Sequence, residues 1–370
     1  MIYLHIGMPK TGTTALQNFL RAHSDALSET GVHYMQAGRR RADGKGNMPI
    51  SHNPIVFDIA QGGPNQSATQ ADFTAEYAAN ADKVCLVSSE MLYTAKPADY
   101  APLLSGIPAE DICITFFCRR YDGFFEADYK QRAKNGKITQ GTTAFVQQRL
   151  ADIHANPMAY NFSGVVANLR AAFPKARIIP RLYDRSTLVN GNVIDDFFDL
   201  LGAEVPIDVD TQGQSNPSLS RAGSDAFGVL TRLIGKKSVR RLRRDMPAHP
   251  VMQRKNDVLE PQEREALVQV LADSDADFRE EFFGDRAALF DAAPLSETDI
   301  NYRRDSAEEN LALQQACELV FSAALDTPGM LDERTPPQDP IGKAKMAKVA
   351  LREKRRRKRA AREAQTPLAG

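Results

Sequence analysis

The chain has 370 residues, of which 42% are hydrophobic and 25% are charged, a balance that is ordinary for a globular protein. This length allows one large or two medium-sized domains. The formal net charge of zero is unevenly spread, since residues 343–363 hold eleven Lys and Arg against two Glu, which is +9 and leaves −9 for the rest. A basic tail therefore follows a mildly acidic body.

The cysteines and the apolar runs argue against a cysteine metal site and a membrane span. Cys85, Cys113 and Cys118 lie in apolar runs typical of core strands, and Cys317 lies in a helical pattern, without CxxC spacing. No apolar run is long enough to cross a bilayer, and no signal peptide precedes the first predicted strand. We therefore expect buried thiols and a cytoplasmic protein.

The N-terminal stretch predicts a strand, a glycine-containing loop and a helix. Residues 2–6 are apolar, as in a buried parallel strand, and residues 7–12 form a turn-rich loop. From Thr13 onward the apolar residues fall at helical spacing. In this geometry, backbone N–H groups and the helix dipole converge on an anion. A simple turn between a strand and a helix is the alternative.

The loop nearly matches the nucleotide-binding motif G-x-x-x-x-G-K-[ST]. Gly7, Gly12 and Thr14 fit this motif. Thr13, however, stands in the place of its lysine, and the lysine of the loop is Lys10, three residues earlier. A cation in that place suits a donor with one phosphate and one further anionic group. The segment resembles the 5′-phosphosulfate loop of the sulfotransferases, which use 3′-phosphoadenosine 5′-phosphosulfate (PAPS).

This resemblance implies transfer of a sulfuryl group from PAPS to an acceptor hydroxyl, on a carbohydrate. It also implies a three-layer, P-loop-like α/β fold with a mainly parallel central sheet and a helical C-terminal part. No metal is expected, because Lys10 already supplies a cation, and Lys10 is the first predicted catalytic residue. The residues that the resemblance assigns to donor binding in the loop are Pro9, Lys10, Thr11, Gly12, Thr13 and Thr14.

The segment over residues 38–53 is rich in Gly, Arg, Asp and Asn and has no periodicity, which is typical of a functional loop. Its basic side chains either form a solvated surface or hold an anionic acceptor beside the phosphate site. These side chains are Arg39, Arg40, Arg41, Lys45 and His52.

A second strand is predicted over residues 84–90 and ends in Ser88, Ser89 and Glu90. Ligands collect at the carboxyl ends of strands in open α/β sheets, so these side chains should face the same crevice as the glycine loop. We predict that Glu90 is the general base, since carbohydrate sulfotransferases place a catalytic glutamate after the corresponding strand. A helix cap or an ion pair with a loop arginine is the alternative for Glu90. The reserve base is His52, because imidazole titrates near neutrality.

The most apolar strand is predicted over residues 112–118 and is followed by Arg119 and Arg120. This segment resembles the family's 3′-phosphate site, and a guanidinium suits a phosphate because it donates two hydrogen bonds at once. The alternative for Arg119 is a salt bridge with Asp122 or Glu126.

Two further positions bear on the 3′-phosphate site. Tyr129 matches the tyrosine of the family segment, whereas Ala127 occupies the place of its serine. We expect Arg120 or a later basic residue to replace the missing contact. The basic stretches over residues 232–244 and 254–255 either close over this phosphate or form solvated helix faces.

The rest of the body predicts one more strand and several helices. Residues 177–184 have the pattern of a strand that Pro180 places at a sheet edge or a bulge. Amphipathic helices are predicted over residues 193–202 and 261–283. The resemblance extends weakly to about residue 290.

We expect a sulfotransferase-like domain over residues 1–324, a linker over 325–341 and a basic tail over 342–370. The tail is expected to be disordered or marginally helical until it contacts an anionic surface. Such a surface is the inner face of the membrane, nucleic acid or an acidic polymer. Two other functions remain open: a nucleotide kinase-like phosphotransferase, and an inactive scaffold that binds an anionic glycan or a membrane.

Overall fold

The computed structural model describes residues 1–39, 48–63, 66–205, 219–245, 249–253, 258–291 and 307–326. The chain divides into two compact units, the first formed by residues 1–127, 146–216 and 259–296 and the second by 128–145, 217–258 and 297–370. Several features predicted from the sequence lie outside the described residues. They are Arg40, Arg41, Lys45, the pair Arg254 and Lys255, most of the linker and the whole basic tail.

The first unit is built on a five-stranded parallel sheet with the order β2-β3-β1-β4-β5. In the register of the sheet, His5 lies opposite Ser88 on one side and Thr115 on the other. This sheet confirms the predicted α/β class, and β5 is an edge strand, as Pro180 required. The strands are β1 (Ile2–His5), β2 (Val32–Tyr34), β3 (Val84–Ser88), β4 (Ile112–Cys118) and β5 (Arg177–Leu182).

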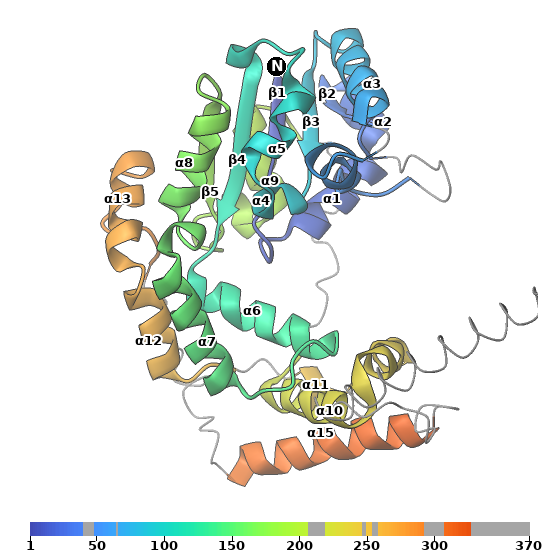
Figure 1. Ribbon diagram of the computed structural model, residues 1–370, viewed down its shortest axis with the longest axis vertical. Helices are drawn as coiled ribbons and strands as arrows, with labels where there is room; N and C mark the ends of the chain where they lie inside the picture. The colour runs from blue at the N-terminus through green and yellow to red at the C-terminus, as the bar shows by residue number, and fades with distance from the viewer. Residues whose placement is uncertain are drawn as a thin grey trace, which may run out of the picture. The chain divides into compact units, whose positions relative to one another are not determined.

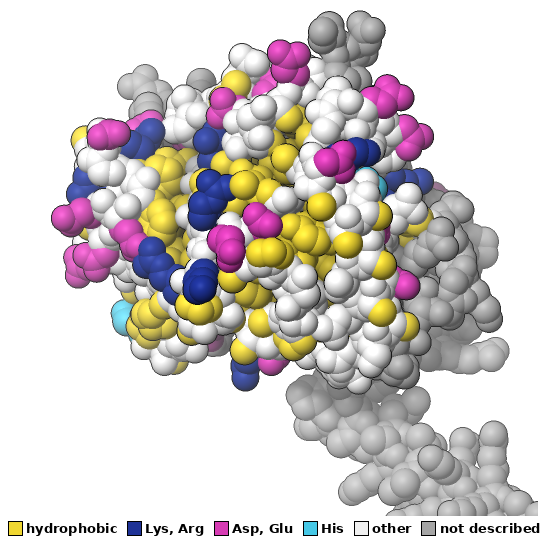
Figure 2. Space-filling view, turned by 90° about the horizontal axis from the view of Figure 1, so that it is seen from above, with side chains coloured by type: hydrophobic (Ala, Val, Ile, Leu, Met, Phe, Trp, Pro, Cys, Tyr) yellow, Lys and Arg dark blue, Asp and Glu magenta, His cyan; other side chains and the backbone are white. Residues whose placement is uncertain are grey.

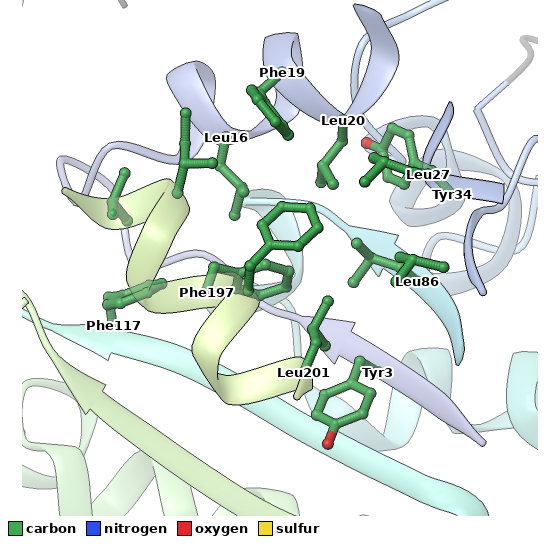
Figure 3. Close-up of a cluster of buried hydrophobic side chains, with 14 of the residues drawn as sticks. Tyr3, Leu16, Phe19, Leu20, Leu27, Tyr34, Leu86, Phe117, Phe197 and Leu201 are labelled. Carbon is green, nitrogen blue, oxygen red and sulfur yellow. The ribbon is translucent and has the colours of Figure 1, made fainter. Parts of the chain in front are cut away.

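One face of the sheet is covered by α1 (Thr13–Ala22), α2 (Ser24–Glu29) and α9 (Val193–Leu201). Their apolar side chains pack against alternate strand residues, among them Tyr3, Leu86 and Phe117. Figure 3 shows side chains of α1, such as Leu16, and of α9, such as Phe197, gathered between the helices and the strands. Full burial of one such side chain stabilises the fold by about 1.5–3 kcal/mol.

Three further helices lie on the opposite face: α4 (Met91–Thr94), α5 (Pro97–Tyr100) and α8 (Phe162–Ala172). In Figure 1, α4 and α5 lie in front of the sheet, whereas α9 lies behind it. The Tyr93 ring contacts the Phe116 ring of β4 at 6.0 Å, while the next residue, Phe117, belongs to the cluster with α9. The chain therefore leaves β1 toward one face and its neighbour β3 toward the other.

Two helical stretches divide at identifiable residues. Asn156 and Pro157 follow the end of α7 (Thr142–Ala155) and separate it from α8. The helix predicted over 261–283, by contrast, is two helices separated at Val270 and Leu271. The acidic residues at the start of the second helix favour a new first turn, because they complement its dipole.

The remaining elements of the first unit are α3 (Gln66–Ala79), α12 (Pro261–Gln269), α13 (Ala272–Phe282) and the short segments η1 (Val56–Ala60), η2 (Ala101–Leu104), η3 (Ala109–Asp111), η4 (Pro157–Ala159) and η5 (Val189–Gly191). Two helices have residues in both units, α6 (Tyr121–Lys134) and α7 (Thr142–Ala155). Among the helices that the structure describes, none is both long and apolar enough to cross a bilayer.

The described part of the second unit is helical and includes α10 (Arg221–Asp245), α11 (Pro250–Gln253) and α15 (Ala307–Asp326). Its core contains Ile234, Val239 and Leu242, which alternate with the basic residues of the stretch over 232–244. Exposed side chains of this stretch include Arg232 and Lys236. The pattern is that of an amphipathic helix with a solvated basic face.

His5, at the end of β1, is fully buried between aromatic rings. Its ring lies 5.3 Å from that of Phe197 and 6.0 Å from that of Phe117, centre to centre. Nδ1 is hydrogen-bonded to Ser88 Oγ at 2.9 Å, and Nε2 has no partner among the described residues. Burial lowers the pKa of His5 from 6.5 to about 3, so the folded protein holds the neutral imidazole.

This burial predicts an acid-sensitive fold. Below pH 6.5 the unfolded chain binds a proton at His5, whereas the folded chain keeps this imidazole neutral down to about pH 3. The contribution of neutral His5 to the free energy of unfolding is therefore complete above pH 6.5 and is lost as the pH falls toward 3. At pH 5 the loss is about 2 kcal/mol. His5→Gln lacks this titration. We therefore compare the free energies of unfolding of the unmodified protein and the variant by urea unfolding. The value for the unmodified protein minus that for the variant should fall by about 2 kcal/mol from pH 7.5 to pH 5. A difference that is independent of pH would contradict the neutral state of His5.

Candidate functional site

The loop between β1 and α1 is held in its conformation by its own residues. Lys10 and Gly12 have left-handed backbones, with φ of 70° and 74°, on either side of Thr11. The buried Thr11 hydroxyl donates to Met8 O at 2.6 Å and so closes the loop. Alternation of left- and right-handed residues turns successive N–H groups toward one centre, as in anion-binding nests.

The backbone N–H groups at the start of α1 are unpaired. Those of Thr11, Gly12, Thr13 and Thr14 find no hydrogen-bond acceptor in the part of the chain that the structure describes. The first helical N–H groups lack an intrahelical acceptor, and the helix dipole places about half a positive charge at this end. Together these groups form a site for an anion.

The two glycines of the loop allow close packing. A Cβ atom at Gly7 would lie 2.5 Å from Thr13 Oγ1, so a side chain there would displace the helix start. At Gly12 a Cβ atom would lie 2.9 Å from Val193 Cγ1 of α9, and the positive φ would add backbone strain. The loop is therefore fixed against both helices, which holds the unpaired N–H groups in place.

The ends of β3 and β4 meet the loop through hydrogen bonds. Gly7 N donates to Ser89 O at 3.2 Å, which places Glu90 directly after a residue that touches the loop. Arg119 Nη1 donates to Lys10 O at 2.6 Å. Because the chain leaves β1 and β3 toward opposite faces, this edge is the point where open α/β sheets form a crevice. The structure thus brings the loop, Glu90 and Arg119 together, as the sequence predicted.

Arg119 is largely enclosed beside the loop. Its guanidinium lies 5.7 Å from the centre of the Tyr183 ring. Burial lowers the pKa of Arg119 from its ordinary value, although a guanidinium stays protonated in proteins. Neither Asp122 nor Glu126 is a salt-bridge partner of Arg119 in the described chain. The position of Arg119 against the loop backbone leaves its Nε and Nη2 groups for an anion.

Glu90 precedes α4 and is partly exposed at the crevice. Its side chain makes no capping hydrogen bond to that helix. Within the described residues its carboxylate also has no ion pair or hydrogen bond, so it is available to accept a proton. The sequence alternative of a helix cap does not hold. The loop arginines Arg40 and Arg41 lie outside the described residues.

His52 has the contacts of a structural residue and not those of a general base. Its Nδ1 accepts from Ser88 N at 3.1 Å, and its Nε2 lies 2.9 Å from Met35 O. The side chain is completely buried, and burial lowers its pKa to about 3. A reserve base must reach the acceptor and titrate near neutrality, so these contacts argue against that role for His52.

Arg120 is bound to a carboxylate. It forms two hydrogen bonds with Asp122, at 2.7 and 3.0 Å, and a third with Asp291 O. Arg264 of α12 contacts the same Asp122 at 2.9 Å and also pairs with Glu126. Burial alone would raise the pKa of Asp122, but the bonds from the two arginines lower it. Arg120 therefore holds this network together, and its predicted role at the 3′-phosphate has no support.

The hydroxyl of Tyr129 is bound by groups of the second unit. Its buried hydroxyl donates to Asp225 Oδ1 at 3.1 Å and to Gln140 O at 3.2 Å, all within the second unit. These hydrogen bonds give no support to a phosphate contact of Tyr129. Ala127, in the place of the family's serine, supplies no hydroxyl.

Sequence reasoning missed one residue of the site and one residue of the neighbouring arginine–carboxylate network. Tyr183 follows β5 directly, and its hydroxyphenyl ring faces Arg119 and Gly12. Its place after a strand end was a usable signal, because such residues line the crevice. Arg264 had no signal, since its partners lie more than 130 residues earlier. In the described ranges no group of three His, Cys, Asp or Glu residues is arranged to hold a metal ion.

No protein-family model and no solved structure matches the chain. A protein of Archaeoglobus fulgidus is similar to part of it, with 34% identity over 107 residues. The matched region is 29% of this chain and 27% of that relative, so the chain spans about a quarter of the relative's length. Since that protein is itself uncharacterized, the similarity assigns no activity.

Proposed function

We propose that this chain is a sulfotransferase that moves a sulfuryl group from PAPS to an acceptor hydroxyl. The observation that carries the proposal is the set of four unpaired N–H groups, from Thr11 to Thr14, beside Lys10. The same loop has the sequence that resembles a 5′-phosphosulfate site. The loop follows β1, which is the central strand of the sheet. This position supports a P-loop-like fold.

The proposed reaction needs a general base and a group of hydrogen-bond donors with positive charge. The acceptor oxygen attacks sulfur, and the bond from sulfur to the 5′-phosphate oxygen breaks, so that adenosine 3′,5′-bisphosphate leaves. The hydroxyl proton passes to the Glu90 carboxylate. Negative charge develops on the leaving phosphate, and Lys10 with the loop N–H groups stabilises it. Arg119 holds a phosphate of the donor through its remaining N–H groups.

Phosphate transfer from ATP is less well supported by the same loop. The standard motif places a lysine at the position of Thr13, and that lysine reaches the β and γ phosphates. Here the Thr13 side chain is buried against Gly7 and supplies no charge. A donor that bears a single phosphate beside a sulfuryl group fits a loop whose cation is Lys10.

A scaffold for anionic polymers would need a surface of predominantly positive charge. On the face drawn in Figure 2, Lys and Arg side chains are intermixed with Asp and Glu, with apolar side chains between them. On this face the mixture of charges favours an enzyme over a polyanion scaffold. We assign contact with an anionic surface to the basic tail, and we place the protein in the cytoplasm, where PAPS is made.

Donor binding is testable by thermal shift. A ligand at about a hundred times its Kd stabilises the fold by about 2.7 kcal/mol, or roughly 3–5 °C for a chain of this size. We expect this shift with adenosine 3′,5′-bisphosphate and a smaller one with ATP and magnesium. Lys10→Ala should remove most of the shift, whereas Lys175→Ala, at an exposed turn, should keep it.

The same measurement distinguishes the other functions. Stabilisation by ATP and magnesium alone would replace the sulfotransferase with a kinase-like enzyme. A protein that responds to neither nucleotide would have no donor site.

The role of Glu90 is testable by turnover. Glu90→Gln keeps the shape of the side chain but cannot take a proton, so kcat should fall by about 10²–10⁴-fold. Binding of adenosine 3′,5′-bisphosphate should stay unchanged, because Glu90 faces the acceptor side. Glu110→Gln, at an exposed carboxylate, is the matched control and should keep full activity. Full activity in Glu90→Gln would assign the base to another residue.

A further inference from the structure

The first unit contains a large cavity on the face of the sheet that carries α4, α5 and α8. Its volume is about 940 Å³, near the upper end of the range of small-molecule sites. It is lined by residues of these three helices and of the end of α7. All of the lining residues belong to the first unit, so the cavity is a property of that unit alone.

The cavity is lined by residues that adjoin the proposed reaction centre in the chain. Ile6 lines it, and the next residue along the chain is Gly7, where the loop starts. Leu92 and Tyr93 also line it, and they follow Glu90 by two and three residues. Neighbours in the chain of both the loop and the proposed base therefore contribute to the wall of the cavity.

The lining of the cavity is mainly apolar and aromatic. Three tyrosines, Tyr93, Tyr100 and Tyr160, contribute rings, and many alanines leave room between the helices. Met158 also lines the cavity. This residue is 52% exposed, so a large apolar side chain faces solvent there. Such a flexible thioether adapts to apolar ligands of different shapes.

The charged groups of the lining are few. Lys96 and Asp152 are its ionisable residues besides the tyrosines, and no arginine lines it. A polyanionic saccharide would lose its hydration in this cavity without an array of cations to replace it. An apolar body, in contrast, gains free energy from burial against such walls.

We propose that this cavity takes the apolar body of an amphiphilic acceptor, whose hydroxyl-bearing head lies at the loop. The inference rests on the proposed sulfotransfer and narrows its acceptor from carbohydrates in general to hydroxyls attached to an apolar chain. The head is a sugar or a simple alcohol, since either offers the hydroxyl that Glu90 would deprotonate.

The test uses alkyl β-glucosides with chains of one to eight carbons, all below their critical micelle concentrations. They share the same hydroxyls and differ in apolar length alone. Affinity measured by calorimetry should rise by up to about fourfold for each methylene that enters the cavity, with an increasingly negative heat-capacity change. With PAPS present, kcat/KM for sulfate transfer should rise in the same order.

Two variants of α8 give a matched comparison. Ala171 and Ala167 are both exposed, but Ala171 lines the cavity and Ala167 does not. Ala171→Trp should weaken binding of octyl glucoside at least tenfold, and Ala167→Trp should leave it unchanged. Binding of adenosine 3′,5′-bisphosphate should be the same in both variants, which also shows that they are folded.

The outcomes separate this inference from the proposed function. Affinities that are independent of chain length in the unmodified protein would overturn the amphiphile proposal, whatever the variants do. Equal effects of the two tryptophans would place the alkyl chain elsewhere and would also overturn it. If alkyl chains bind as expected but adenosine 3′,5′-bisphosphate does not bind, the cavity proposal stands as a binding site and sulfotransfer fails.

Discussion

The site depends on a small set of backbone N–H groups that have no acceptor among the residues that the structure describes. Thr11 to Thr14 lie where the positive end of α1 meets a loop with two left-handed residues, Lys10 and Gly12. Leaving such groups unpaired costs free energy, and an anion offsets that cost. The parallel sheet supplies the other residues of the site, because it brings Ser89 and Arg119 from two other strand ends into contact with the same loop.

Much of the sheet and of the loop could be predicted from the sequence because both are encoded locally. Apolar runs of strand length marked β1, β3 and β4, and glycine spacing with a following helical pattern marked the loop and α1. The rule that ligands gather at carboxyl strand ends placed Glu90 and Arg119 near the loop. The same rule, applied to β5, points to Tyr183.

The predicted roles that find no support concern side chains whose polar partners a sequence pattern does not reveal. Arg120 looks like a phosphate ligand by position, but Asp122 binds it, and that carboxylate also pairs with Arg264 from α12. His52 titrates near neutrality in a peptide, yet here it is buried with both ring nitrogens occupied. Periodicity gives the buried face of an element but not the polar partner that the face meets, so these roles required the three-dimensional arrangement.

The proposed function requires the unpaired amides of the loop to donate hydrogen bonds to the phosphate of the donor. The most direct measurement is a titration of the isotope-labelled protein with adenosine 3′,5′-bisphosphate, followed by the amide resonances of Thr11, Gly12, Thr13 and Thr14. New hydrogen bonds to phosphate should move these four resonances downfield together and saturably, with Lys10 required for the effect. Saturable shifts elsewhere in the protein, with these four amides unmoved, would contradict the assignment of the loop as the donor site.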